Sequence, residues 1–198
     1  MWACRSGSDE AAVAASRSPV KSAAAVRTAL FGLALALCGA TTAAAQEGLP
    51  GGASSLNETH GDWVVKCQQQ NAATRCALSQ SQVNQQSRQR VLAIELAPDD
   101  DGETASGVVI LPFGLRLSSG AVLRIDEGAP LPALGFSTCL PAGCLVPLTF
   151  DAAMVAALRG GTALKLTAVA NDGEQQVAFS ISLTGFSSAL ARAAALDQ

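Results

Sequence analysis

Residues 164–183 read LKLTAVANDGEQQVAFSISL, and this stretch decides the fold class. Apolar residues occupy every second position on both sides of a short polar centre: Leu164, Leu166 and Ala168 before it, and Val177, Phe179, Ile181 and Leu183 after it. Strict alternation indicates a strand with one buried and one wet face, which is typical of antiparallel sheets. The central Asn171-Asp172-Gly173 is a strong hairpin signal. The stretch therefore predicts two antiparallel strands joined by a tight turn.

The same period of two recurs toward the N-terminus, in residues 63–67, 90–97, 113–117 and 123–125, while 108–111 is a short, fully apolar run. Turn-forming residues separate these runs at 98–102, 118–120 and 126–128. Residues 151–160 and 187–196 instead show helical spacing, and Asp151 is a good N-cap. The sequence predicts a mostly β domain of seven to nine strands: an antiparallel β-sandwich or barrel-like domain with one or two short helices.

Residues 1–45 have the three-part layout of a secretory signal peptide. Arg17, Lys21 and Arg27 precede an apolar run at 29–40, and the small residues Ala43 and Ala45 fit the cleavage rule for such signals. The run of about 12 residues is short for a membrane anchor, which needs roughly 20. Lipidation at Cys38 is an alternative, although Leu37 is larger than the residue such signals prefer. We expect cleavage after Ala45, no membrane-spanning segment afterwards, and a periplasmic, outer-membrane-associated or secreted protein.

The charge balance and composition exclude several classes of protein. The chain of 198 residues has 13 basic and 16 acidic residues, one His and no Tyr, and 49% of it is hydrophobic. It is too apolar for a disordered protein, and its acidity gives no footprint for nucleic acid. The leader contains four of the basic residues and two of the acidic ones, which leaves nine and 14, a formal net charge of −5 for residues 46–198.

Four of the six cysteines remain after the predicted cleavage: Cys67, Cys76, Cys139 and Cys144. An exported chain meets an oxidising environment, so an even number of cysteines suggests disulfides. Four cysteines allow three connectivities, and we expect the two local pairs, Cys67–Cys76 across a hairpin and Cys139–Cys144 around a tight Pro-Gly loop. Only the second pair approaches zinc-ligand spacing, so we expect no metal site.

No constellation of catalytic residues stands out. His60 lies within 46–60, which we read as a flexible N-terminal arm because it is rich in Gly and Ser. Residues 99–103 lack the spacing of a calcium loop, and phosphate-binding glycine motifs are missing from the sequence. Most of the six aromatic residues of 46–198 fall on alternating faces, so we expect the aromatic residues in the core. The sequence thus predicts a non-enzymatic domain without catalytic, cofactor-binding or metal-binding residues.

Two segments remain as candidates for binding another molecule. Residues 80–89 (QSQVNQQSRQ) are rich in Gln and offer amide and backbone hydrogen bonds to a partner. Residues 132–147 form an apolar loop in which Leu140, Leu145 and Val146 are candidates for an exposed patch. Each segment has a plainer reading as well: an exposed hairpin without a partner for the first, and packing against the adjacent helix for the second.

The order and spacing of these motifs resemble the invasion-associated locus B family of bacterial exported proteins. The resemblance rests on Gly61-Asp62-Trp63, the residues 111–115 (LPFGL), the second cysteine pair and residues 183–186 (LTGF), and it spans roughly residues 61–190. It implies a single compact, mostly β domain over 61–198 and, in some members, a link to host-cell invasion. It supplies no catalytic residues. We expect a domain that binds an unidentified protein or an envelope surface; a periplasmic hydrolase with an acidic site and a structural or chaperone-like periplasmic protein are the alternatives.

Overall fold

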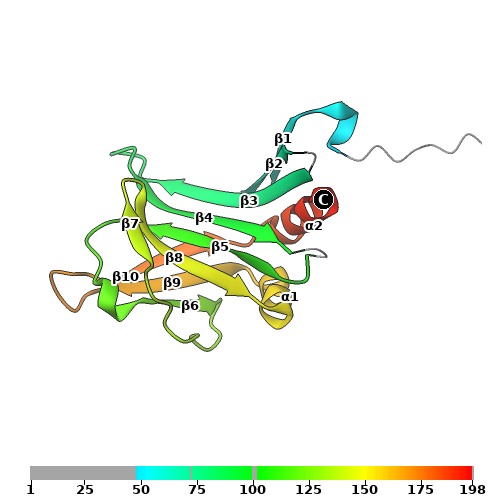
Figure 1. The fold of residues 1–198 in the computed structure, drawn as a ribbon. Coiled ribbons are helices and arrows are strands. Elements are labelled where there is room, and N and C mark those ends of the chain that lie inside the picture. The colour runs from blue at the N-terminus through cyan, green and yellow to red at the C-terminus, as the bar shows by residue number, and fades with distance from the viewer. Residues whose placement is uncertain (1–47, 72, 100–101, 198) are drawn as a thin grey trace, which may run out of the picture. The chain divides into compact units, whose positions relative to one another are not determined.

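The computed structural model describes residues 48–71, 73–99 and 102–197 (Figure 1). The predicted signal peptide, Cys38 and the predicted cleavage site lie outside these residues. The described part contains ten strands, two α-helices and two short 3-10 turns, η1 (Pro50–Gly52) and η2 (Leu117–Ser119). Both helices follow strands of the second half of the chain: α1 (Ala152–Gly160) and α2 (Phe186–Leu196).

Two antiparallel sheets form the framework of the domain. The large sheet has the order β1-β2-β3-β4-β5-β8-β7, and the small sheet has the order β10-β9-β6. The strands of the large sheet are β1 (Ser55–His60), β2 (Trp63–Gln70), β3 (Ala73–Val83), β4 (Arg90–Pro98), β5 (Ala105–Leu111), β7 (Thr138–Leu140) and β8 (Gly143–Phe150). Those of the small sheet are β6 (Ala121–Ile125), β9 (Ala163–Val169) and β10 (Gln176–Ser182). The prediction of an antiparallel β-sandwich or barrel-like domain with one or two short helices is confirmed. Of its two forms the sandwich is the one found, because the sheets do not close into a barrel.

The core lies between the sheets and under α2, which packs on β2 and β3. Trp63 of β2 and Phe186 of α2 are both 1% exposed and meet edge to face, with ring centroids 5.3 Å apart. The Trp63 indole Nε1 also donates to the Ser182 carbonyl at 2.9 Å, so its buried polar atom is satisfied. The alternating residues of β9 and β10 that the sequence singled out, such as Leu166 and Ile181, are buried here.

The two helices begin as the local sequence dictates. Asp151 caps α1, because its side chain accepts a hydrogen bond from the Met154 amide at 2.8 Å. Gly185 precedes α2 with φ of 86°, and a Cβ there would come within 2.0 Å of the His60 carbonyl oxygen. A glycine therefore allows the chain to pass closely over the end of β1 before α2 starts.

The N-terminal region differs from the expected flexible arm over 46–60. Residues Ser55–His60 form β1, which pairs with β2 along its whole length, and Leu49 is buried in the core. Leu56 is the only large aliphatic residue of β1, so hydrophobic alternation is too weak to reveal the strand in the sequence. Pairing with β2 and the contacts of α2, rather than local pattern, hold β1 in place.

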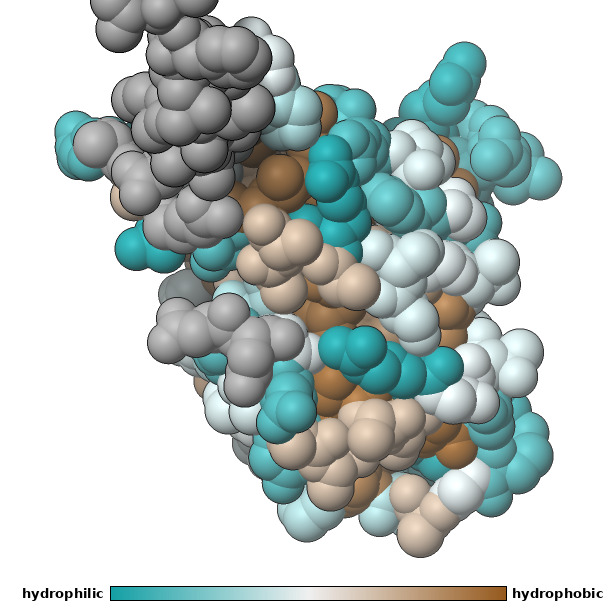
Figure 2. Space-filling model, turned by 90° about the vertical axis from the view of Figure 1, so that its right-hand side faces the viewer, coloured by the Kyte–Doolittle hydropathy of each residue, from teal (hydrophilic) through white to brown (hydrophobic). Residues whose placement is uncertain are grey.

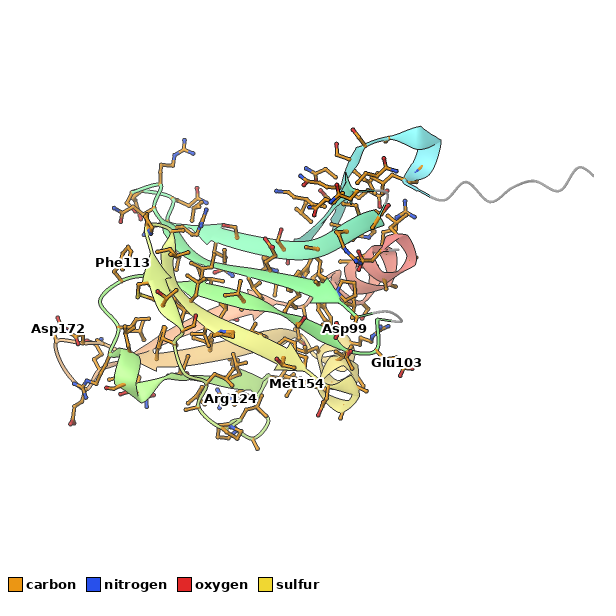
Figure 3. All side chains as sticks on the ribbon, in the orientation of Figure 1. Asp99, Glu103, Phe113, Arg124, Met154 and Asp172 are labelled. Carbon is orange, nitrogen blue, oxygen red and sulfur yellow. A yellow bond between two sulfur atoms is a disulfide. The ribbon has the colours of Figure 1, made fainter. Side chains whose placement is uncertain are left out.

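Residues 113–117, which the sequence predicts as a strand, are a crossing between the two sheets. Gly114 has φ of 86° and turns the chain after β5, and only Leu115 makes a bridge, to Ala170. The change of sheet breaks the ladder here, because β5 belongs to the large sheet and β6 to the small one. Phe113 consequently points outward instead of into the core (Figure 3).

Candidate interaction surface

The large hydrophobic side chains that stay exposed gather at one end of the domain. Among the described residues these are Val83, Phe113, Leu117 and Leu140, with exposures of 47%, 61%, 44% and 49%. Val83 ends β3, Leu140 ends β7 and Leu117 begins η2, while Phe113 follows shortly after β5. These parts of the chain meet at the left end of the domain in Figure 1. The expectation that the aromatic residues are core is wrong for Phe113. Trp63, Phe150, Phe179 and Phe186 are buried, as expected.

The opposite end of the domain carries the two helices (Figure 1). Figure 2 looks onto this end, where apolar side chains appear in separate areas between hydrophilic ones. A hollow of about 420 Å³ between α1 and residues 125–131 is lined by Ile125, Leu131 and Met154, which are half-buried and pack against the core. The prominent apolar residues are therefore concentrated at the end away from the helices.

A groove of about 720 Å³ opens between two hairpins at the end that carries Phe113. We call it the tip groove. One wall is the β3–β4 hairpin, the other is the β7–β8 hairpin, and the segment after β5 forms its floor. Its lining residues are Ser81, Val83, Arg88, Gln89, Arg90, Pro112, Phe113, Pro141, Ala142 and Gly143.

The β3–β4 wall has a defined backbone conformation. The register shifts between Gln82 and Val83, and such a bulge bends a strand and re-aims the side chain that follows. The Asn84 side-chain oxygen then accepts from the Gln86 and Ser87 amides at 2.9 and 3.0 Å. Arg88 adopts φ of 58°, and its amide donates to the Asn84 carbonyl at 2.8 Å. The loop is thus held by its own hydrogen bonds with Arg88 displayed at its tip.

The β7–β8 wall is fixed by a disulfide and a close backbone contact. Cys139 and Cys144 lie opposite each other in the register and form a disulfide, with Cα atoms 3.9 Å apart. Gly143 has φ of 135°, and a Cβ there would meet the Leu111 carbonyl oxygen at 2.4 Å. The hairpin tip therefore lies directly over the end of β5, where only a glycine fits.

The tip groove is basic although the domain is acidic. Arg88 and Arg90 line it, none of its lining residues is acidic, and neither arginine forms an ion pair with another described residue. The acidic Asp172 and Glu174 lie on the β9–β10 connection at the same end but outside the lining (Figure 3). A partner that fills the groove therefore meets apolar side chains next to two uncompensated positive charges.

Comparison with known proteins places this architecture in a family. The family model of the invasion associated locus B (IalB) protein matches residues 63–194. This chain belongs to the IalB family. An invasion protein B homolog of Brucella abortus is 51% identical over 150 residues, which cover 76% of this chain and 86% of that protein. Invasion protein B of Bartonella bacilliformis is 40% identical over 152 residues, covering 76% and 81%.

The fold of this IalB family member also matches a solved structure. The crystal structure of invasion associated protein B from Bartonella henselae superposes with a TM-score of 0.66 at 39% identity. The match covers 72% of this chain and 97% of that one. The family resemblance read from the sequence is confirmed by the family model and by the relatives. The matched relatives are themselves named for invasion.

The tip groove joins the two segments that the sequence marked as candidates for binding. Residues 80–89 supply one wall, and residues 132–147 supply the other. Within them the sequence marked some of the wrong residues, since Gln80 is 7% exposed and Val146 is fully buried. It also missed Phe113 as a surface residue, because only the crossing between the sheets turns this side chain outward.

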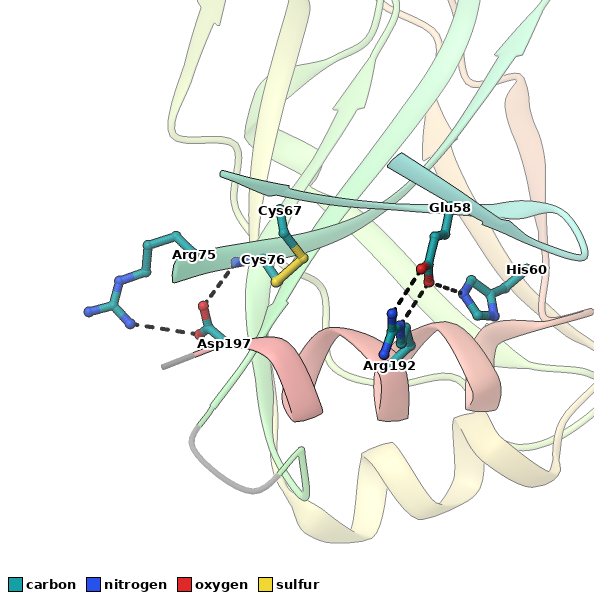
Figure 4. Close-up of a disulfide and its surroundings, with 7 residues drawn as sticks. All are labelled: Glu58, His60, Cys67, Arg75, Cys76, Arg192 and Asp197. Carbon is teal, nitrogen blue, oxygen red and sulfur yellow. Dashed lines mark hydrogen bonds and ion pairs between the residues drawn. A yellow bond between two sulfur atoms is a disulfide. The ribbon is translucent and has the colours of Figure 1, made fainter. Parts of the chain in front are cut away.

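The other disulfide of the IalB domain, Cys67–Cys76, lies away from the tip groove, beside the end of α2. Cys67 and Cys76 face each other on β2 and β3 and form a disulfide, with Cα atoms 4.1 Å apart. Asp197, beyond α2, accepts from the Cys76 amide at 2.9 Å and lies 3.8 Å from the Arg75 guanidinium (Figure 4). These contacts attach the end of α2 beside the disulfide, so we interpret this site as structural.

His60 belongs to a salt-bridge cluster on β1. Arg192 of α2 donates from Nε and Nη2 to the two oxygens of Glu58 at 2.8 and 2.9 Å, and His60 Nε2 lies 3.4 Å from Oε2 (Figure 4). The bidentate Arg192 guanidinium is the main cause that lowers the pKa of Glu58, and the same pairing raises the pKa of Arg192. The cluster clamps β1 to α2.

The remaining perturbed carboxylates are also held in the ionised state. The backbone amides of Thr162 and Ala163 lower the pKa of Asp126, to which they donate at 3.0 and 2.8 Å. The hydrogen bond from Lys165 is the main cause that lowers the pKa of Glu127. A general acid at neutral pH needs its pKa raised instead.

Within the described residues, no group of three or more potential metal ligands is found. Likewise, no described helix is both long and apolar enough to cross a membrane.

Proposed function

We propose that this protein is an exported, non-enzymatic domain that binds another protein through the tip groove. The observation that supports it best is the gathering of exposed Val83, Phe113 and Leu140 around a preformed groove. Soluble domains rarely leave several large apolar side chains together in water, and such patches mark sites of protein association. Aromatic and arginine side chains are also the residues that contribute most at protein interfaces.

Binding rather than catalysis is supported by the state of the carboxylates. Glu58, Asp126 and Glu127 each have a lowered pKa, and each is explained by a structural partner. The tip groove contains no acidic residue, so it lacks the pair of carboxyl groups that a glycosidase-like site uses. These observations favour a binding domain over the alternative of a periplasmic hydrolase.

The names of the relatives support a link between this protein and invasion. The matched proteins of Brucella abortus and Bartonella bacilliformis bear the name invasion protein B. We extend that association to this chain and place it in the periplasm, at the outer membrane or outside the cell, after cleavage at Ala45. In this reading the β-sandwich is a scaffold, and the hairpin tips are the part that meets the partner.

The proposal is tested by comparing two matched double variants in the source bacterium. Phe113→Ser with Leu140→Ser removes the apolar character of the tip, and Ala153→Ser with Ala156→Ser changes two exposed residues of α1 at the other end. Each tagged protein is recovered from the envelope fraction, and the proteins that accompany it are quantified by mass spectrometry. We expect specific proteins with the wild type and the α1 variant that are lost with the tip variant.

Equal recovery with both variants would contradict the proposal, as would the lack of any accompanying protein. Both positions of the tip variant are exposed, so we expect its urea unfolding midpoint to match that of the wild type. That measurement separates loss of binding from loss of folding. A purified wild-type protein that hydrolyses envelope substrates, with activity abolished by a carboxylate substitution, would favour the hydrolase instead.

A further inference from the structure

We infer that the tip groove takes an acidic peptide segment of its partner, with a bulky apolar side chain placed beside Phe113. This inference rests on the proposed function and specifies the chemistry of the segment. It follows from the two kinds of side chain that line the groove, one apolar and one cationic. The chemistry of a lining predicts the complementary chemistry of what binds there.

The apolar component comes from both walls and the floor. Phe113 rises from the floor, Val83 lies on the β3–β4 wall, and Pro141 follows the exposed Leu140 on the β7–β8 wall. An aromatic or aliphatic side chain of the partner that enters here loses contact with water on several sides at once. Such enclosed apolar anchors supply most of the free energy of peptide binding.

The cationic component is Arg88 and Arg90. Both line the groove without an ion-pair partner among the described residues. By contrast, Arg192 and Lys165 are paired with Glu58 and Glu127. Guanidinium groups bind carboxylates in a bidentate way, so unpaired arginines beside an apolar pocket favour Asp or Glu next to the anchor residue.

The walls are held in position before a partner arrives. The turn after Asn84 is closed by side-chain and backbone hydrogen bonds, and the opposite hairpin is closed by the disulfide of Cys139 with Cys144. The backbone of Arg88 is fixed in the left-handed region, which a non-glycine residue adopts only where its surroundings enforce it. Fixed walls reduce the entropy lost on binding a flexible peptide.

The overall charge favours a peptide over an anionic membrane. Residues 46–198 have a formal net charge of −5, and the acidic Asp172 of the β9–β10 connection lies at the same end of the domain as Phe113 (Figure 3). A wide anionic surface would be repelled by these charges, whereas a narrow segment meets the two arginines alone. Membrane binding usually requires several clustered basic residues, and the groove has two.

A random peptide library displayed on phage, selected on the purified domain, tests the inference without knowledge of the partner. We expect the selected peptides to be enriched in Asp or Glu next to Phe, Leu, Ile or Trp. The strongest peptide, made with a fluorescent label, is then titrated by anisotropy. Arg88→Gln with Arg90→Gln and, separately, Phe113→Ser are each expected to weaken binding by about tenfold or more.

Two controls make the comparison specific. Arg75→Gln removes an exposed arginine at the other end, so we expect it to leave the affinity unchanged. Asp172→Asn with Glu174→Gln removes negative charge from the β9–β10 connection at the same end and is expected to strengthen binding severalfold at low salt. Selection of basic or uncharged peptides, no selection at all, or an affinity insensitive to the groove variants would overturn the inference.

A membrane ligand is a further outcome that would overturn it. Vesicles with phosphatidylglycerol in phosphatidylcholine are offered to the domain, and sedimentation that depends on Arg88 and Arg90 would replace the peptide with a lipid surface. The envelope recovery described under the proposed function is independent of these experiments. If proteins are lost with the tip variant but acidic peptides fail to bind, the peptide chemistry is wrong while the proposed function stands.

Discussion

The side-chain amide of Gln80 hydrogen-bonds both backbone groups of Ser182. Gln80 Nε2 donates to the Ser182 carbonyl at 3.0 Å, and the Ser182 amide donates to Gln80 Oε1 at 3.1 Å. Gln82 adds a bond to the Ser180 carbonyl at 2.7 Å. Two glutamines of β3 thus satisfy the open edge of β10, where a neighbouring strand would otherwise pair. They join the two sheets although the sheets share no ladder at this edge.

Gln80→Leu should destabilise the domain substantially. The substitution keeps the size of the buried side chain but leaves the half-buried Ser182 amide without its partner. We expect the free energy of unfolding to fall by about 2–3 kcal/mol, measured by urea denaturation. Gln86→Leu, in the exposed β3–β4 turn, is the matched control and should change it by less than about 0.5 kcal/mol. Equal effects of the two would show that the Gln80 contacts contribute little.

Gly143→Ala tests the seating of the β7–β8 hairpin over β5. A methyl group there would collide with the Leu111 carbonyl, and the backbone has a positive φ. We expect a loss of more than about 1 kcal/mol in the free energy of unfolding. Gly135→Ala is the control, because no atom lies within 4 Å of the added Cβ and its φ is not in the positive range. An unchanged unfolding midpoint for Gly143→Ala would mean that the hairpin sits elsewhere.

The disulfides should be recovered as two local pairs. Proteolysis without reductant is expected to yield peptides linking Cys67 to Cys76 and Cys139 to Cys144. Cys139→Ala with Cys144→Ala should lower the free energy of unfolding by about 2 kcal/mol, because it releases a small closed loop of the unfolded chain. A peptide that joins one end of the domain to the other would refute this connectivity.

The Glu58 clamp should make part of the stability depend on pH. Arg192 lowers the pKa of Glu58 below its usual value of 4.5, with a smaller contribution from His60. A lowered pKa in the folded state gives stability that is present above the unfolded pKa and is lost as the pH falls through the folded pKa. Glu58→Gln should therefore lower the urea midpoint at pH 7, and its difference from the wild type should shrink as the pH falls below 4.5 and through the lowered pKa of Glu58.

Glu174→Gln is the matched control for this measurement. Its carboxylate lies on the exposed β9–β10 connection and forms none of the described ion pairs. We expect its unfolding midpoint to follow that of the wild type across the same pH range. If Glu58→Gln also follows the wild type, the clamp between β1 and α2 does not stabilise the fold.

The sequence predicts those elements whose signal is local. The alternation around Asn171-Asp172-Gly173 predicts β9 and β10, and Asp151 predicts the start of α1. The disulfide connectivity follows from hairpin spacing, since paired residues of adjacent strands lie within bonding distance. In each case the residues that carry the signal are neighbours along the chain.

The remaining features depend on contacts between distant parts of the chain. Residues 113–117 alternate like a strand, yet the chain leaves one sheet for the other there and exposes Phe113. Gln80 looks like a surface residue in a polar segment, but β10, some 100 positions later, accepts its hydrogen bonds. The tip groove combines segments around 81–90, 112–113 and 141–143, so no local pattern marks it.

Photo-crosslinking at Phe113 tests most directly whether the tip groove meets a partner protein. Benzoylphenylalanine replaces Phe113 in one strain and the exposed Ala156 of α1 in another, and intact cells of the source bacterium are irradiated. The account predicts a discrete protein adduct at position 113 and none at 156, lost when Arg88 and Arg90 are also changed to Gln. Adducts of equal yield at both positions, or at 156 alone, would contradict it.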